Sequence, residues 1–280
     1  MKIFRYMVKR NGYVFANGNR QETATYGVSN QSVEDAELNA QRNLEIIQDR
    51  INRNERFSPA EDYEATIREE FLEEIAPGNV ITRNYYGAEI LNTESLIFAD
   101  IDNSDFKKRY VPGFIGRLFG KKAETQEEYQ ARLRNSVLNA VNPEWKEKAH
   151  IRVYQTHSGF RVLFSGLNLP ANSKACAGIL KQMNSDPLYI CLCKKQGCCR
   201  ARLTPKPTRI RQRIMRLKYP YAPEDLSVIS EWVQTYQELS RKYAVCKLIQ
   251  TYGKDPLPAD MEVIAYHDQK CKVGLDLPLA

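Results

Sequence analysis

LIFADID, residues 96–102, is a continuous apolar run that ends in two carboxylates. Such a run is typical of a central strand that is covered on both faces. Because side chains alternate between the two faces of a strand, Asp100 and Asp102 are expected to emerge side by side at its carboxyl end. Two neighbouring carboxylates repel each other, and a divalent cation removes that repulsion. The stretch therefore predicts an Mg²⁺ or Mn²⁺ site at Asp100 and Asp102, with a solvated acidic strand end as the alternative.

A second stretch, THSGFRVLF at residues 156–164, places a polar turn with a glycine before an apolar strand. Glycine lets a backbone approach a ligand closely. His157, Ser158 and Arg161 have side chains that can donate hydrogen bonds to phosphate oxygens. We therefore expect these three residues to bind a nucleotide, and we expect the strand of Arg161 to lie beside the strand of Asp100. An ordinary hairpin with an exposed histidine is the alternative.

The remaining pattern predicts an α+β fold with a mixed or antiparallel central sheet, because helices alternate with hairpins rather than with single parallel strands. The N-terminus is expected to form a short β element with a turn at Asn11-Gly12. Apolar spacing and capping residues such as Ser32 indicate helices at residues 32–53, 59–75, 124–141, 173–183 and 226–245. Short apolar runs indicate strands at residues 80–83, 88–91, 96–101, 151–154, 159–164, 189–193, 200–203 and 261–266.

Three segments are expected along the chain. Residues 1–79 would form an N-terminal α/β segment with acidic helices, and residues 80–223 a catalytic-like core that ends in a basic window. Residues 224–280 would form a C-terminal helix and strand that pack on the core. No internal repeat and no long Gly/Ser linker marks a sharper boundary.

The composition is that of an ordinary globular protein, with 280 residues, 42% hydrophobic and 27% charged. No stretch approaches the roughly 18 uninterrupted apolar residues of a membrane helix, and the first residues lack the apolar core of a signal peptide. The protein is therefore expected to be cytoplasmic and to bind no membrane. Seven cysteines, an odd number, favour a reducing compartment over a disulfide framework.

The net charge of +7 is unevenly distributed. Residues 187–223, the basic window, hold ten Lys and Arg and no acid, whereas residues 21–75 carry fourteen acids against five bases. Cations interleaved with tyrosines suit a nucleic-acid backbone. The residues expected to bind nucleic acid are Arg200, Arg202, Lys206, Arg209, Arg211, Arg213 and Arg216. Alternatively, the basic window forms salt bridges to the acidic segment of the same chain.

Four cysteines lie within nine residues, at positions 191, 193, 198 and 199. Cysteine thiolates bind Zn²⁺, but this spacing is not the usual pair of Cys-x2-Cys motifs. Zinc bound by Cys191, Cys193, Cys198 and Cys199 is therefore the less favoured interpretation, and buried apolar thiols are favoured. His267 and Cys271 stand apart from these residues and carry no prediction.

Taken in order, these stretches resemble the archaeo-eukaryotic primase-polymerase superfamily. LIFADID is similar to the first motif, an apolar strand that ends in Asp-x-Asp or Asp-x-Glu. VYQTHSGFRVLF, residues 153–164, is similar to the second motif, a Ser-Gly turn before an apolar strand that usually carries a histidine. This chain has Val162 just after Arg161, and its local histidine, His157, precedes the glycine. Asp186 is the best match to the single acid of the third motif, and the resemblance covers residues 96–209.

The resemblance implies an RRM-like catalytic core, two divalent metal ions, nucleoside triphosphates as substrates and nucleotidyl transfer on nucleic acid. It assigns Asp100, Asp102 and Asp186 to catalysis, the first two as metal ligands. Because the motif histidine is missing, a nucleic-acid-binding protein without catalysis is one alternative, and a metal-dependent nuclease is another. Residues 81–93, 185–193 and 200–207 also resemble an uncharacterised bacterial protein family.

Overall fold

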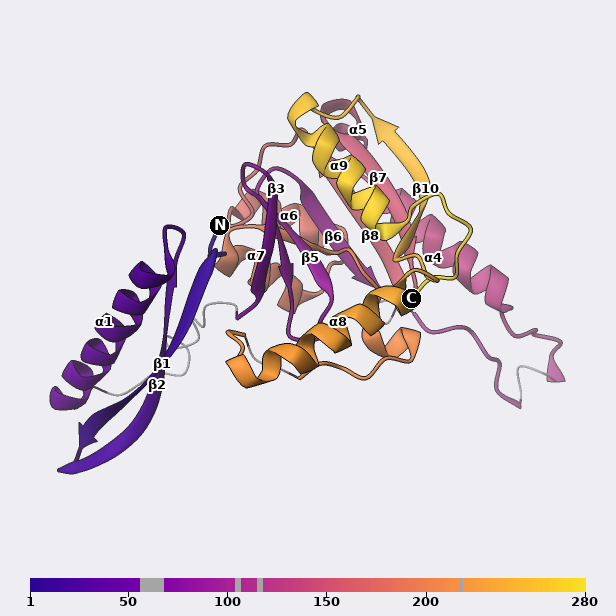
Figure 1. Cartoon of the computed structure of the whole chain (residues 1–280). Coiled ribbons are helices and arrows are strands. Elements are labelled where there is room, and N and C mark those ends of the chain that lie inside the picture. Colours follow the sequence, from indigo (N-terminus) through magenta and orange to yellow (C-terminus); the bar gives the residue numbers. More distant parts are fainter. Residues whose placement is uncertain (56–67, 104–106, 115–117, 217–218) are drawn as a thin grey trace. The chain divides into compact units, whose positions relative to one another are not determined.

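The computed structural model describes residues 1–55, 68–103, 107–114, 118–216 and 219–280 (Figure 1). The predicted α+β class is confirmed: helices accompany antiparallel sheets. The chain divides into two compact units, Met1–Asn92 with Pro205–Arg241 and Thr93–Thr204 with Lys242–Ala280. These boundaries differ from the three consecutive segments expected, because the chain alternates between the units: it leaves the first unit for the second, returns to the first, and ends in the second.

The first unit begins with a hairpin of two long strands, β1 (Tyr6–Ala16) and β2 (Asn19–Ser29). The turn lies at Asn17-Gly18, where both residues have positive φ, as tight hairpins require. The expected turn at Asn11-Gly12 is wrong, because both residues lie inside β1. Helix α1 (Val33–Asn52) follows and is capped by the Ser32 side chain, as predicted.

The same unit contains β3 (Glu70–Ala76), β4 (Asn79–Arg83) and β5 (Glu89–Thr93), which are successive neighbours in a sheet. The helix expected over 59–75 is wrong where it overlaps β3, and residues 56–67 lie outside the described part of the chain. β3 pairs with β4 across a tight turn, and Arg83 Nε lies 2.9 Å from Glu70 Oε2. Cross-strand pairing therefore overrides the helix propensity of the glutamates. Helix α8 (Leu226–Ser240) completes the unit.

The second unit contains a four-stranded antiparallel sheet in the order β10-β7-β8-β6. Its strands are β6 (Ile97–Asp102), β7 (His150–Thr156), β8 (Gly159–Ser165) and β10 (Cys246–Gly253). The prediction that the Arg161 strand lies beside the Asp100 strand is confirmed, because β8 pairs directly with β6. β10 was not predicted, and an RRM-like form of the core stays a prediction.

The remaining elements of this unit are α4 (Gln126–Ala140), α5 (Pro143–Lys148), α6 (Lys174–Gln182), α7 (Pro187–Gln196), β9 (Cys199–Arg202) and α9 (Pro258–Cys271). Two expected strands, at 189–193 and 261–266, are wrong, because these residues lie in α7 and α9. Helices α7 and α9 each begin with a proline in the first turn and end at a residue with positive φ, Gly197 and Lys272 respectively. Such start and stop signals favour a helix over a strand.

Helices cover both faces of the second unit's sheet. On one face, Trp145 of α5 packs edge-to-face on Phe164, with ring centroids 5.6 Å apart. On the other face, His267 of α9 contacts the rings of Phe98 and Tyr154, with centroids 5.3 and 5.2 Å away. Figure 1 shows α9 lying over this sheet. Within the described ranges, every helix is too short or too polar to cross a membrane.

The β6–β8 pairing gives a test of the fold. A Cβ atom added at Gly159 would lie 1.9 Å from the carbonyl oxygen of Ile101, so Gly159→Ala should lower the free energy of unfolding by about 1–3 kcal/mol. Gly178→Ala in α6 is the matched control, because nothing lies within 4 Å of its added Cβ. That substitution should stabilise the protein by about 0.5–1 kcal/mol. Urea unfolding measures both, and a Gly159→Ala variant as stable as the wild type would contradict the described strand contact.

Candidate functional site

The two acids of β6 lie on one face of the strand. Asp100 and Asp102 are exposed, whereas Ile101 between them is 2% exposed. The strand period therefore places both carboxylates on the same side, as the sequence predicts. Carboxylate oxygens in this arrangement suit a hard divalent cation such as Mg²⁺ or Mn²⁺.

The turn between β7 and β8 lies beside the carboxyl end of β6. Asp102 pairs with Gly159, and the backbone N–H of Asn103 donates to the carbonyl of Ser158 over 2.8 Å. In the turn, His157 Nδ1 lies 2.8 Å from Ser158 Oγ. The residues of the first two motifs, far apart in the sequence, are therefore neighbours at one end of the sheet.

Arg161 shares the face of the acids but does not project into solvent. It pairs in register with Asp100 on β6 and with Tyr154 on β7. Its side chain is 2% exposed, and its Nη1 donates to the carbonyl of Arg202 over 2.9 Å. Burial lowers the pKa of Arg161, but the charges of Asp100 and Cys271 outweigh burial and raise it. The expectation that Arg161 contacts a triphosphate is therefore revised, because its guanidinium lies in the interior as a fixed positive charge.

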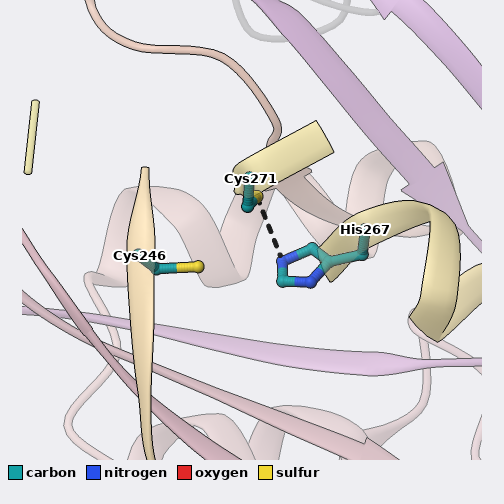
Figure 2. Close-up of side chains that lie close together, drawn as sticks. All are labelled: Cys246, His267 and Cys271. Atoms are coloured by element: carbon teal, nitrogen blue, oxygen red, sulfur yellow. Dashed lines mark hydrogen bonds between the residues drawn. The ribbon is translucent and has the colours of Figure 1, made fainter. Parts of the chain in front are cut away.

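Beside Arg161 lies a cluster of Cys246, His267 and Cys271, all three fully or nearly fully buried (Figure 2). Their candidate ligand atoms all lie within 4.8 Å of one another, and Cys271 Sγ is 3.6 Å from His267 Nε2. Figure 2 shows the Cys246 sulfur directed from its strand toward the imidazole of His267. Among the described residues, this is the group of three or more His, Cys, Asp and Glu side chains close enough to share a metal.

A carboxylate orients the histidine of this cluster. His267 Nδ1 lies 2.9 Å from Asp268 Oδ1, and Asp268 also accepts hydrogen bonds from Tyr154 and Arg152. Arg161 Nη1 lies 3.1 Å from His267 Nε2, so Nε2 is the acceptor and Nδ1 carries the proton. An imidazole held in this tautomer by a carboxylate is the usual arrangement of a metal-binding histidine.

The electrostatics of the cluster separate the two thiols. Burial raises the pKa of the Cys271 thiol, but a hydrogen bond from Cys246 and the neighbouring His267 and Arg161 lower it well below its ordinary value. The hydrogen bond to Cys271, together with burial, raises the pKa of Cys246. Burial lowers the pKa of His267, but Cys271 and Asp268 raise it overall. The hydrogen bond from Cys246 and the neighbouring His267 and Arg161 therefore favour a thiolate at Cys271.

The basic window is not one continuous surface. Arg200 is 9% exposed and donates to Gln196 Oε1 over 3.0 Å. Contrary to the expectation that it binds nucleic acid, its side chain is therefore directed into the protein. Arg202 and Arg209 are partly buried, and Lys206 is exposed. The exposed arginines of the window are Arg211, Arg213 and Arg216, all in the first unit. Their exposure is the opposite of what docking on the acidic segment requires.

Asp186 lies at the start of α7. Its side chain accepts a hydrogen bond from the backbone N–H of Leu188 over 2.8 Å and caps α7. This capping role accounts for an acid at the start of the helix. Catalysis by Asp186 stays a prediction.

The four clustered cysteines do not form the shape of a zinc site. Because α7 is a helix, Cys191 is exposed while Cys193, two residues later, is buried. Burial raises the pKa of Cys198 to about 12, so this thiol is protonated. Cys193 instead shares a hydrogen bond with Cys199, which lowers the pKa of Cys193. None of the seven cysteines forms a disulfide.

Sequence reasoning missed the buried cluster. The signal that was present is His267 and Cys271 at a spacing of four residues, which places both on one helix face. A helix prediction for 258–271 was required before that spacing had meaning. Cys246 lies on an unpredicted strand and had no local signal. Compared with known proteins, the chain matches no family model, no curated protein and no solved structure.

The carboxylate behind His267 gives a test of this geometry. Asp268→Asn removes the charge that pairs with Arg152, and it should lower the free energy of unfolding by about 2–3 kcal/mol, since both side chains are largely buried. The matched control is Asp276→Asn, whose partner Lys247 is in an exposed ion pair. That change should stay within about 0.5 kcal/mol of the wild type. Equal unfolding free energies for the two variants in urea would show that the Asp268 network does not hold α9 in place.

Proposed function

We propose that this protein is a metal-dependent nucleotidyl transferase of the primase-polymerase type, acting on nucleic acid. The observation that supports the proposal is the register of β6 and β8. It brings Asp100 opposite Arg161 and Asp102 opposite Gly159, with both carboxylates exposed. This juxtaposition of an Asp-x-Asp strand with a Ser-Gly turn is what the superfamily resemblance requires.

Part of the sheet, formed by β6, β7 and β8, supports the RRM-like core that we propose. β6 lies next to β8, β7 lies beyond β8, and α4 and α5 connect β6 to β7. This is a split β-α-β arrangement. β10 extends the sheet beyond β7.

Divalent cations held by Asp100 and Asp102 would supply Lewis-acid activation and charge neutralisation for phosphoryl transfer. The chain's own residues set the geometry: β6 fixes the separation of the two carboxylates, and its antiparallel neighbour fixes the turn beside them. In that turn, His157 and Ser158 are positioned to donate hydrogen bonds to phosphate oxygens. Arg161, buried in register with Asp100, contributes a positive charge behind the acids. Asp186 is retained as a proposed third acid.

Nucleic acid is proposed to bind through the exposed arginines of the basic window, Arg211, Arg213 and Arg216. Arginine contacts to phosphates are independent of sequence and release counterions, so binding through them is steeply salt-dependent. Arg213 is fixed by its backbone, because its carbonyl accepts a hydrogen bond from the indole N–H of Trp232 over 2.7 Å.

The test is extension of a labelled primer–template with nucleoside triphosphates and Mg²⁺ or Mn²⁺. The wild type should extend the primer, and Asp100→Asn/Asp102→Asn should reduce the rate by at least ~10²-fold while binding of the oligonucleotide is kept. Asp255→Asn/Asp276→Asn is the matched control, because it removes two exposed acids of the same unit outside β6, and it should extend normally.

A second variant separates binding from chemistry. Reversing Arg211, Arg213 and Arg216 to Glu should abolish measurable binding, or lower the slope of log affinity against log salt by about 3. Shortening of the primer by the wild type would instead identify a nuclease. Binding without extension or shortening under every metal and nucleotide condition would overturn catalysis and leave a nucleic-acid-binding protein.

A further inference from the structure

We propose that Cys246, His267 and Cys271 bind a structural Zn²⁺ ion that joins α9 to β10 on the sheet face that also carries the acids. The site is separate from the proposed Mg²⁺ or Mn²⁺ site, and it uses sulfur and nitrogen ligands in place of carboxylate oxygens. Nothing in this inference requires the protein to be catalytically active.

The distances fit a tetrahedral zinc centre. Zinc lies about 2.3 Å from sulfur ligands and about 2.0–2.1 Å from nitrogen ligands, so a thiolate and an imidazole on one ion lie roughly 3.5 Å apart. Cys271 Sγ and His267 Nε2 are 3.6 Å apart, and the Cys246 sulfur completes a set within 4.8 Å. The ligands come from two elements, a strand and a helix, so one ion would cross-link them.

The ligand chemistry selects zinc over the hard cations. Soft thiolates with an imidazole are typical of zinc, whereas Mg²⁺ and Ca²⁺ take oxygen ligands. Two thiolates balance the charge of Zn²⁺, which leaves a neutral centre in an environment where an uncompensated charge is costly. All three ligand residues are 0% exposed. Asp268 already holds His267 with Nδ1 protonated, so Nε2 is the nitrogen that can bind a metal, which would replace the hydrogen bond that Nε2 accepts from Arg161.

The neighbours of the cluster are compatible with a bound ion. Arg161 Nη1 lies 3.9 Å from Cys271 Sγ, and an N–H directed at a metal-bound sulfur is a common supporting contact. The same Nη1 donates to the carbonyl of Arg202. This contact would keep the guanidinium in place when a metal binds Nε2 of His267 and displaces the hydrogen bond between Nη1 and Nε2. The cluster itself supplies three ligands, so the fourth position of a tetrahedral ion would be filled from outside it.

The rival explanation uses the same residues without a metal. In that account Arg161 alone balances the Cys271 thiolate, and Cys246 is a protonated hydrogen-bond donor. The two accounts differ in metal content and in the effect of removing Cys246. A zinc site needs both sulfurs, whereas a thiolate–guanidinium pair needs Cys271 alone.

The experiment is elemental analysis of the full chain, purified without chelator and dialysed, by inductively coupled plasma mass spectrometry. The wild type should contain close to one zinc ion per chain, and Cys246→Ser, His267→Asn and Cys271→Ser should each lose most of it. Cys176→Ser and Cys191→Ser are the matched controls, one buried and one exposed cysteine outside the cluster, and both should keep the ion. Wild-type protein without zinc, or zinc retained by Cys246→Ser, would overturn the proposal.

A measurement on the wild type protects the test against variants that fail to fold. The zinc-edge X-ray absorption spectrum should fit two sulfur neighbours at about 2.3 Å and nitrogen at about 2.0–2.1 Å. A shell of oxygen and nitrogen without sulfur would place the ion elsewhere and would reject the site. Because the primer-extension assay does not enter this test, failure of the zinc site and failure of the proposed function can be distinguished.

Discussion

Burial of one guanidinium, that of Arg161 in β8, is the constraint around which the second unit is organised. Arginine keeps its proton in a protein interior, so a side chain that is 2% exposed must find acceptors and compensating charge there. The acceptors come from the carbonyl of Arg202 at the end of β9 and from His267 and Cys271 on α9. These contacts fix the position of α9 on the face that also carries Asp100. If Arg161 were apolar, His267 and Cys271 of α9 would lose the hydrogen bonds that connect them to β8.

The same constraint divides this face into two environments with different chemistry. At the edge strand β6, Asp100 and Asp102 remain in solvent, where hard cations and phosphates can reach them. Under α9, sulfur and imidazole groups are excluded from water and held by the Asp268, Tyr154 and Arg152 network. An exposed oxygen site and a buried sulfur site therefore lie on one sheet, separated by a fixed positive charge. We interpret the first as the place of chemistry and the second as the reinforcement of the scaffold that holds it.

Local patterns in the sequence predicted those parts of the fold that depend on local physics. α1 follows from helical spacing and the Ser32 cap, and the strands β6, β7 and β8 follow from apolar runs and a turn. The short apolar runs in α7 and α9 do not distinguish helix from strand, and the deciding signals were the prolines and positive-φ residues at their ends. In the site, the shared face of Asp100 and Asp102 was predictable from the strand period. The burial of Arg161 and the approach of Cys246 to α9 depend on tertiary packing, which no local pattern encodes.

The central claim is that the carboxylates of β6 bind a catalytic cation, and anomalous diffraction tests it most directly. Crystals of the full chain soaked in Mn²⁺ and measured at the manganese edge should show an anomalous peak between the carboxylates of Asp100 and Asp102. The peak should be absent from crystals of the Asp100→Asn/Asp102→Asn variant soaked in the same way. A manganese peak elsewhere on the protein, or an ordered pair of carboxylates with no peak at saturating Mn²⁺, would contradict the account.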